Sequence, residues 1–531
     1  MTKKRVAALA GLLGLVGAGL SAVPIVLEIE EALGLAWLFR VRGPIDPPDE
    51  VAIVSLSGES AEALGVSYHV DDWPRRLHAE VVDRLAEAGA AVIVFDIMFI
   101  APRPDDLEGD ARLASAIARA GNVVLAERVV EKRRANAIGE ERRLPIEPLR
   151  RAALATAPFM LPLVPVRVSQ SWTFGRAADT PSLPSVALHA YALSVHDRLL
   201  DMLAAARPEL AERLMGLRAD VARENGLDEV MRRLRSIFRN DPGLAGELRE
   251  QLDGAEAPLL GALIALYAGD DSRYLNYYGP ARTIPTVPYH EVLVMDTRAL
   301  REAFSGRAVF IGFSESRASE QQDEFVAVYA DRSGQRLAGV EIGATLFANL
   351  LRLEAIRPTP LPVHLAVVAA WGIVAAAIGL LLRGFAAIAV GAAAGVAFAA
   401  AAQYVFEAHG LWTPLAIPLG LQLPLALLVG LSLSHGVLRR QRERVRSALG
   451  YYVPASVVDR LAKESLEPHA NREVVFGTCL VTDAEQYTTL SESLHPSELV
   501  ELMDAYYEAL VDVVHRHGGV VSDIGGDSMI A

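Results

Sequence analysis

Two aspartates near the end of this 531-residue chain have the type and spacing of metal ligands. Asp483 follows the apolar run "EVVFGTCLVT", and Asp527 lies 44 residues later, in the turn of "GGVVSDIGGDSMIA". If this closing hairpin pairs beside the first run, the two carboxylates converge at adjacent strand ends. Such a pair suits two Mg²⁺ ions, one activating an attacking hydroxyl and the other steadying leaving phosphates, with Mn²⁺ as a substitute. A glycine pair alone indicates only a tight turn.

The residues around these aspartates predict the order strand, helix, helix, strand, turn, strand. The first strand covers residues 473–482 and delivers Asp483 at its end. Pro496 fits the first turn of the long helix, and Gly518 with Gly519 ends it. One face of that helix is apolar, with Leu499, Leu502, Tyr506, Leu510 and Val513.

Asp483, "PSELVELMDAYYEAL", "HGGVV" and the pair Gly526–Asp527 follow one another as they do in class III adenylate and guanylate cyclase domains. Residues 472–531 therefore resemble the amino-terminal part of such a domain, which has an α+β, ferredoxin-like (palm-type) fold. The resemblance implies that Asp483 and Asp527 are the catalytic metal ligands, assisted by the carbonyl of Ala484.

The resemblance also implies a purine nucleoside triphosphate as substrate, in a site formed across a homodimer. The residues that match its substrate contacts are Thr488, Asp523 and Gly526. Two positions depart from the family's pattern, because Gln486 and Tyr487 stand where glycine and phenylalanine are usual. We therefore expect the phosphate loop to be tighter or less open.

Asp523 bears on the choice between ATP and GTP. Adenylate cyclases commonly carry lysine here, which donates to adenine N1, whereas an ionised aspartate cannot donate. It can accept from guanine N1–H and N2–H, as glutamate does in guanylate cyclases, or from the adenine amino group. The base chemistry favours GTP, and the abundance of adenylate cyclases among bacterial members favours ATP. We place ATP, with cyclic AMP and pyrophosphate as products, narrowly first.

Two rival functions remain open. A catalytically inactive cyclase-like receptor that signals by dimer contact fits the unusual Gln486 and Asp523. A diguanylate cyclase would carry Gly-Gly-Asp-Glu-Phe, but Ser528 and Met529 replace its last two residues, and no "NDxxGH"-like stretch precedes them. The family's asparagine and arginine for the transition state would follow Ala531, so we expect the chain to be truncated and inactive as it stands.

Four apolar stretches are long enough to cross a bilayer, in keeping with 52% apolar residues and a mean hydropathy of +0.27. They cover residues 6–27, 362–382, 384–406 and 411–438. Basic residues beside them fall on one side if all four cross, which predicts that both chain ends are cytoplasmic. Residues 439–471 then form a cytoplasmic linker whose arginines can bind anionic membrane lipids. This linker resembles those before bacterial cyclase domains, so we expect a multi-pass protein of the bacterial cell (inner) membrane.

Residues 28–357, between the first two spans, alternate apolar runs with amphipathic helices, which predicts an extracytoplasmic α/β domain with a parallel sheet. Residues 196–261 are charge-rich and helical in period, and we interpret them as a helical insertion. Four blocks, among them "FRVRGPIDPPDEVAIVSLSGES" and "YLNYYGPARTIPTVPYHEVL", resemble the second class of CHASE-type sensor domains. Its signal is unknown. Asp96 and Asp323 are candidates to line a ligand site, although strand-end aspartates usually serve as structural acceptors.

Composition narrows the remaining classes. A net charge of −14 argues against a nucleic-acid partner. Cys479 is the single cysteine, so neither an intrachain disulfide nor a cysteine-based zinc site can form, and we interpret it as a small core residue. The sequence thus predicts a multi-domain membrane protein in signal transduction, with an α/β parallel-sheet sensor, four transmembrane helices and the start of a cyclase domain.

Overall fold

The computed structural model describes residues 3–103, 106–134, 137–161, 168–175, 179–220, 226–315, 324–329, 337–382, 384–433, 436 and 476–531. The predicted linker 439–471 and the candidate Asp323 lie outside these residues. The chain divides into two compact units. One comprises Met1–Ile378 and Ile388–Leu427, and the other comprises Gly379–Ala387 and Leu428–Ala531.

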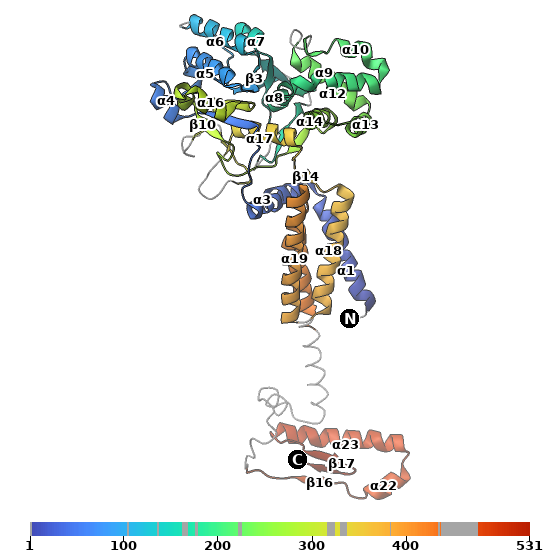
Figure 1. Ribbon diagram of the computed structural model, residues 1–531. Coiled ribbons are helices and arrows are strands. Elements are labelled where there is room, and N and C mark those ends of the chain that lie inside the picture. Colours follow the sequence, from blue (N-terminus) through green and yellow to red (C-terminus); the bar gives the residue numbers. More distant parts are fainter. Residues whose placement is uncertain are drawn as a thin grey trace. The chain divides into compact units, whose positions relative to one another are not determined.

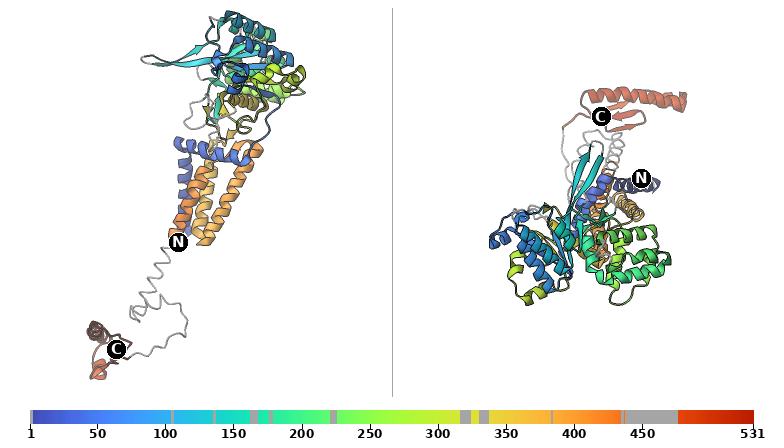
Figure 2. Two further views of the ribbon diagram at one scale, coloured as in Figure 1. Left: turned by 90° about the vertical axis from the view of Figure 1, so that its left-hand side faces the viewer. Right: turned by 90° about the horizontal axis from the view of Figure 1, so that it is seen from above.

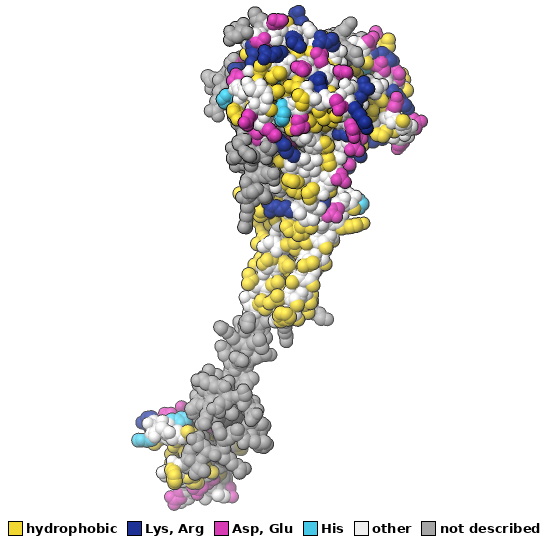
Figure 3. Space-filling view, turned by 60° about the vertical axis from the view of Figure 1, so that its left-hand side comes forward, with side chains coloured by type: hydrophobic (Ala, Val, Ile, Leu, Met, Phe, Trp, Pro, Cys, Tyr) yellow, Lys and Arg dark blue, Asp and Glu magenta, His cyan; other side chains and the backbone are white. Residues whose placement is uncertain are grey.

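Three helices are long and apolar enough to cross a membrane, or four if a bent pair at the amino end counts as one span. The three are α18 (Leu361–Leu381), α19 (Phe385–His409) and the helix Ala416–Leu433, which begins as the π-helix η6 (Ala416–Gln422). The bent pair is α1 (Lys3–Ser21) followed by α2 (Pro24–Ile29), η1 (Glu30–Leu35) and α3 (Ala36–Arg42). Hydrophobic side chains cover the surface of these helices in Figure 3.

The first predicted span, residues 6–27, is broken before Pro24, where the helix axis bends by 83°. Proline has no N–H to continue the hydrogen bonds of α1. The second helix continues to Arg42, past the predicted domain boundary at residue 28. In it, Glu30 accepts hydrogen bonds of 2.6 Å from the backbone N–H groups of both Leu415 and Ala416. This carboxylate therefore caps the first turn of the last apolar helix.

Small residues bring the apolar helices into close contact. A Cβ atom on Gly372 of α18 would lie 2.7 Å from the Cα of Gly14 in α1. Beside them, the amide of Gln422 donates to the carbonyl of Val368 at 3.1 Å. Close backbone approach and hydrogen bonds between helices are the main attractions available inside a bilayer.

The sensor is built on a seven-stranded sheet with the order β10-β1-β11-β2-β3-β4, in which β5 also pairs with β3. Its strands are β1 (Val51–Leu56), β2 (Val92–Asp96), β3 (Val123–Arg134), β4 (Ala137–Arg143), β5 (Ala155–Pro158), β10 (Thr286–Pro288) and β11 (Ala308–Phe313). All neighbours pair in parallel except β3 and β4, which form an antiparallel hairpin that projects from the sheet (Figure 2). The sheet is therefore mixed with a parallel core, because β3 extends past its parallel neighbours to pair with β4.

Helices cover both faces of this sheet (Figure 1), as continuous apolar strands require. Ile53 and Val54 of β1 point to opposite faces and belong to two separate hydrophobic cores. The core of Val54 includes residues of α4 (Gly58–Leu64), α5 (Arg75–Ala88), α6 (Leu107–Ala120), α7 (Glu147–Ala152), α15 (Tyr289–Val294) and α16 (Thr297–Phe304). The core of Ile53 includes α8 (Leu183–Tyr191) and α17 (Gly339–Arg352).

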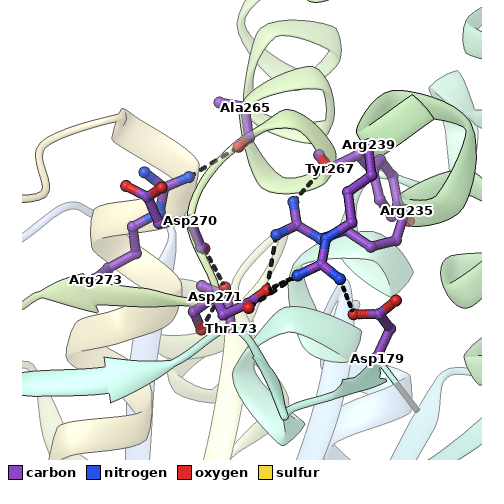
Figure 4. A network of polar contacts seen from close by, with 9 residues as sticks. All are labelled: Thr173, Asp179, Arg235, Arg239, Ala265, Tyr267, Asp270, Asp271 and Arg273. Atoms are coloured by element: carbon purple, nitrogen blue, oxygen red, sulfur yellow. Dashed lines mark hydrogen bonds and ion pairs between the residues drawn. The ribbon is translucent and has the colours of Figure 1, made fainter. Parts of the chain in front are cut away.

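Helices also fill the region interpreted as a helical insertion. They are η3 (Leu193–Val195), α9 (His196–Ala206), η4 (Pro208–Leu210), α10 (Ala211–Met215), α12 (Leu227–Asn240), α13 (Leu244–Glu250) and α14 (Ala257–Ala268). Arg235 and Arg239 of α12 both reach Asp271, at 2.8 and 2.6 Å, and Arg239 also pairs with Asp179 (Figure 4). The Arg235 side chain is 3% exposed, so this network fixes the position of α12 against the neighbouring strands.

Short elements complete the sensor. They are η2 (Val70–Asp72), β6 (Gln170–Trp172), β7 (Phe174–Gly175), β8 (Thr180–Pro181), β9 (Ser272–Tyr274), β12 (Glu324–Phe325) and β13 (Leu337–Ala338). Two further strands, β14 (Arg357–Pro358) and β15 (Leu411–Trp412), pair in parallel at one end of the apolar helices. Residues 411 and 412 were predicted to begin the last span, but they form a strand. The helix of that span begins at Ala416.

Residues 476–531, in the second unit, form a three-stranded antiparallel sheet and two helices. They are β16 (Val481–Asp483), α22 (Tyr487–Ser493), α23 (Pro496–Arg516), β17 (Asp523–Gly525) and β18 (Ser528–Ile530), with the sheet order β16-β18-β17. This is the predicted sequence of elements. The first strand is shorter than predicted, because among residues 476–483 the ladder to β18 covers only Val481–Asp483.

Candidate functional site

The strand register brings the two candidate metal ligands together. In the antiparallel pair of β16 and β18, Asp483 lies directly opposite Ser528, the residue after Asp527. Both aspartates therefore lie at the same end of the small sheet. Asp483 is exposed and Asp527 is half-buried, so water can complete a coordination shell around a bound ion.

The turn that carries Asp527 is held from two sides. Gly526 has a φ of 64°, a conformation that favours glycine. The hydroxyl of Tyr507, on α23, donates a 2.7 Å hydrogen bond to the carbonyl of Gly526. Partial burial, and then the charge of Asp527, raise the pKa of Tyr507. The sequence analysis did not identify Tyr507; its signal was the second tyrosine of "DAYYEAL", beside the apolar face.

The donors at this end are hard oxygens, which fit Mg²⁺ or Mn²⁺. The carbonyl of Ala484, predicted to assist, accepts the N–H of Tyr487 at 3.3 Å and retains a second lone pair. Within the described ranges, no three His, Cys, Asp or Glu side chains gather around one point, so this centre offers two carboxylates.

The predicted phosphate loop contains an unusual backbone conformation. Gln486, which precedes α22, has φ 64° and ψ 22°. A side chain destabilises this left-handed conformation, and glycine adopts it without that cost. Gln486 thus adopts the conformation that the glycine usual at this place in class III cyclase domains would favour. Thr488 lies two residues later, exposed in the first turn of α22.

Replacing Gln486 with glycine is therefore expected to stabilise this loop by about 1 kcal/mol. Hydrogen exchange of the α22 amides should slow about fivefold, as measured by mass spectrometry on the purified protein. Gln486→Ala keeps the unfavourable φ and serves as the control. Equal exchange rates in the glycine and alanine variants would contradict the explanation.

Asp523 lies away from the two metal candidates. It pairs across the hairpin with Ile530, whereas Gly525, next to the turn, pairs with Ser528. Two residues of strand separate these pairs, roughly 7 Å. The Asp523 carboxylate is exposed and accepts the N–H of Ile524 at 3.0 Å. It is thus separated from the end of the sheet that carries Asp483 and Asp527.

The sensor places one predicted candidate at the carboxyl edge of its sheet. Asp96 ends β2 opposite Gly312 of β11, and a Cβ atom on Gly312 would lie 3.2 Å from that of Asp96. Glu341, which the sequence analysis missed, is 3% exposed near the start of α17. It accepts the Ser314 hydroxyl at 2.9 Å, and burial raises its pKa. A lone acid within the apolar "GVEIGATLF" was the signal.

Arg42 joins the sensor to the apolar helices. Its guanidinium donates to Asn276 at 2.6 Å and also to the carbonyl of Tyr277. The same group lies 4.8 Å from the ring centre of Phe39 and 5.5 Å from that of Phe406 on α19. A change in the sensor segment after β9, which carries Asn276, can therefore reach two apolar helices through one side chain.

A family model, described as the CHASE2 domain, matches residues 7–384. No curated protein and no solved structure matches the chain. The match confirms the predicted sensor of the second CHASE class and, with the apolar helices, indicates a membrane-bound signalling receptor. Residues 385–531 lie outside the match, so the cyclase domain stays a prediction. Because the matched residues make up more than half of the chain, the protein belongs to the CHASE2 domain family.

Proposed function

We propose that this receptor controls the cyclisation of a purine nucleoside triphosphate, with ATP narrowly ahead of GTP. The observation that carries the proposal is the register that sets Asp483 opposite Ser528 and so beside Asp527. An isolated Gly-Gly-Asp turn would support only a structural role. A second carboxylate at the same strand end, together with a helix that clamps the turn, supports a metal centre for phosphate chemistry.

The two aspartates would hold a pair of Mg²⁺ ions, which activate the ribose 3′ hydroxyl and stabilise the departing pyrophosphate. Asp483 and Asp527 would bind these ions at the end of the sheet. Tyr507 positions the Asp527 turn through Gly526. Thr488 and Gly526 would contact the phosphate oxygens, and Asp523 would accept hydrogen bonds from the base. The homodimer implied by the family resemblance would supply the remaining groups.

The proposed topology places the sensor outside the cytoplasm and the two aspartates inside it. Basic residues beside the apolar helices support this orientation. Arg42, which contacts both the sensor and α19, supports a path from the signal to the membrane helices. The signal would then change how two cyclase domains meet.

The test is nucleotide turnover by the complete gene product in lipid nanodiscs. We expect Mg²⁺-dependent formation of cyclic AMP from ATP, with slower formation of cyclic GMP from GTP. Faster turnover of GTP would reverse the substrate order and leave the reaction class intact. Failure with both nucleotides, in protein that binds Mn²⁺ and dimerises, would favour the alternative of an inactive receptor, which the unusual Gln486 and Asp523 support.

Asp523→Lys tests the base contact. Lysine donates to adenine N1, whereas aspartate accepts, so the ratio of ATP to GTP turnover should rise at least about tenfold. Asp512→Lys, on the exposed side of α23, makes the same change of charge and should leave the ratio unaltered. Equal ratios in the two variants would remove Asp523 from the substrate site.

A further inference from the structure

A cavity of about 420 Å³ opens at the carboxyl edge of the sensor sheet, between the end of β2 and the starts of α5 and α6. Ligand sites in open α/β sheets occur at this edge. Three arginines and three aspartates line it, namely Arg75, Arg103, Arg128, Asp71, Asp72 and Asp106. Its volume lies within the range of small-molecule sites, roughly 300–1,000 Å³.

Arg75 is the fixed group of this cavity. It is 4% exposed, and its guanidinium lies 4.4 Å from the ring centre of Phe99. Its Nε donates to Asp110 at 3.2 Å, and Asp110 also accepts the backbone N–H of Arg103 at 3.1 Å. Among the described residues, Asp110 is the one hydrogen-bond acceptor of this guanidinium. Within that part of the chain the two Nη groups have no acceptor, so they can donate to a ligand.

The surroundings of Arg75 favour a negative group. Burial, and then the charge of Arg103, lower the pKa of Arg75, while the charges of Asp110 and Asp71 raise it. Arg75 is also the first residue of α5, a helix that has no acid in its first turn and no side-chain cap. The partial positive charge of that helix end adds to the two guanidinium groups. A carboxylate bound here would offset the positive charge of both guanidinium groups and of the helix end.

The aspartates that line the cavity favour a positive group. Asp106 already caps α6 by accepting the N–H of Gly109 at 3.0 Å. Asp71 and Asp72 lie on η2, and both are exposed. The carbonyl of Asp72 accepts from Arg103 at 2.7 Å, which fixes η2 beside Arg103. With three charges of each sign, the cavity suits a zwitterion better than a phosphate dianion.

We propose that this cavity is the sensor's ligand site and that it binds a small zwitterion of the amino-acid class. The carboxylate meets Arg75 and Arg103, and the ammonium group meets Asp71 and Asp72. This inference concerns binding by the sensor alone. It goes beyond the proposed cyclase activity, and its test has no turnover step.

The test measures binding of the twenty common L-amino acids to the full chain in nanodiscs by calorimetry, with acetate, methylamine and inorganic phosphate as probes. We expect at least one amino acid to bind with a Kd below about 1 mM, and the three probes to bind at least about tenfold more weakly. Arg75→Gln should weaken binding about 10- to 100-fold. Arg76→Gln, at the exposed neighbouring position, is the matched control and should bind normally.

Exposed Asp71 provides a second variant in case Arg75→Gln does not fold. Asp71→Asn should weaken amino-acid binding about 3- to 10-fold and leave the binding of acetate unchanged. The proposal is overturned if none of the amino acids binds at up to about 10 mM, or if phosphate or acetate binds as tightly as the best amino acid. It is also overturned if the Arg75 or Asp71 variants bind as the Arg76 control does.

Discussion

Replacing Asp527 with asparagine is expected to lower nucleotide cyclisation at least about 10³-fold, or about 4 kcal/mol in the activation barrier. Asparagine keeps the shape of the side chain, but it removes the charge that would hold a divalent ion. The same loss is expected for Asp483→Asn. The double variant should be hardly worse than either single one, because the two residues act on the same pair of ions.

Asp512→Asn is the matched control, since it removes one carboxylate from the exposed face of α23 and should leave turnover unaltered. A second readout is the binding of Mn²⁺ followed by electron paramagnetic resonance, which needs no substrate. Both aspartate variants should lose tightly bound Mn²⁺. If either variant retains more than about a tenth of the activity, the ligands of the reacting metal lie elsewhere.

The elements around these aspartates were predictable because each has a local signal. Pro496 and Gly518 limit the long helix, and the alternation of apolar residues predicts strands. The left-handed Gln486 was not predictable, because local propensity argues against that conformation for glutamine. The clamp from Tyr507 to Gly526 depends on how α23 packs across the sheet, and no periodicity contains that information.

The apolar helices and the sensor were also predictable only in part. Hydropathy predicts apolar helices, and an internal proline explains why the first of them breaks at Pro24. The strand alternation predicts a sheet with two covered faces, but not the hairpin of β3 and β4. The sequence analysis chose aspartates as ligand candidates and passed over Arg75. In "DDWPRR" this arginine looks solvated, and its burial comes from Phe99 and Asp110, which are distant in the sequence.

Acidification is expected to destabilise the sensor steeply below about pH 6.5, because three histidines are buried in the neutral form. Burial lowers the pKa of His78 to about 3 and holds those of His189 and His196 below the ordinary value of 6.5. The charges of Arg75 and Arg103 lower the pKa of His78 further. The charge of Asp197, on α9, raises the pKa of His196. The charge of Arg218, in the segment after α10, lowers it.

The hydrogen bonds of two of these histidines leave no place for an extra proton. Nε2 of His196 lies 2.7 Å from the carbonyl of Leu217, which can only accept, so this nitrogen carries the proton. Nδ1 of His196 must then accept from Nε2 of His189, 3.0 Å away. The remaining nitrogen of His189 accepts from the hydroxyl of Tyr267. Protonating either ring breaks one of these bonds in a fully buried position.

The sign of the effect follows from the direction of the shifts. Below about pH 6.5 the unfolded chain binds protons that the folded sensor does not, so the free energy of unfolding falls as the pH falls. Each histidine contributes a slope of up to about 1.4 kcal/mol per pH unit, and the loss through His78 continues towards its folded pKa of about 3. Glu341, whose pKa is raised by burial, acts in the opposite direction above about pH 4.5.

The slope can be measured from denaturant unfolding of the full chain between about pH 4.5 and 7. Trp73 is a local probe, because its ring stacks on His78 with 6.5 Å between the ring centres. His78→Phe should reduce the slope by up to about 1.4 kcal/mol per pH unit, whatever it does to the absolute stability. His69→Phe, at an exposed position, should not change the slope. Equal slopes in these two variants would mean that His78 takes up its proton in the folded sensor as readily as in the unfolded chain.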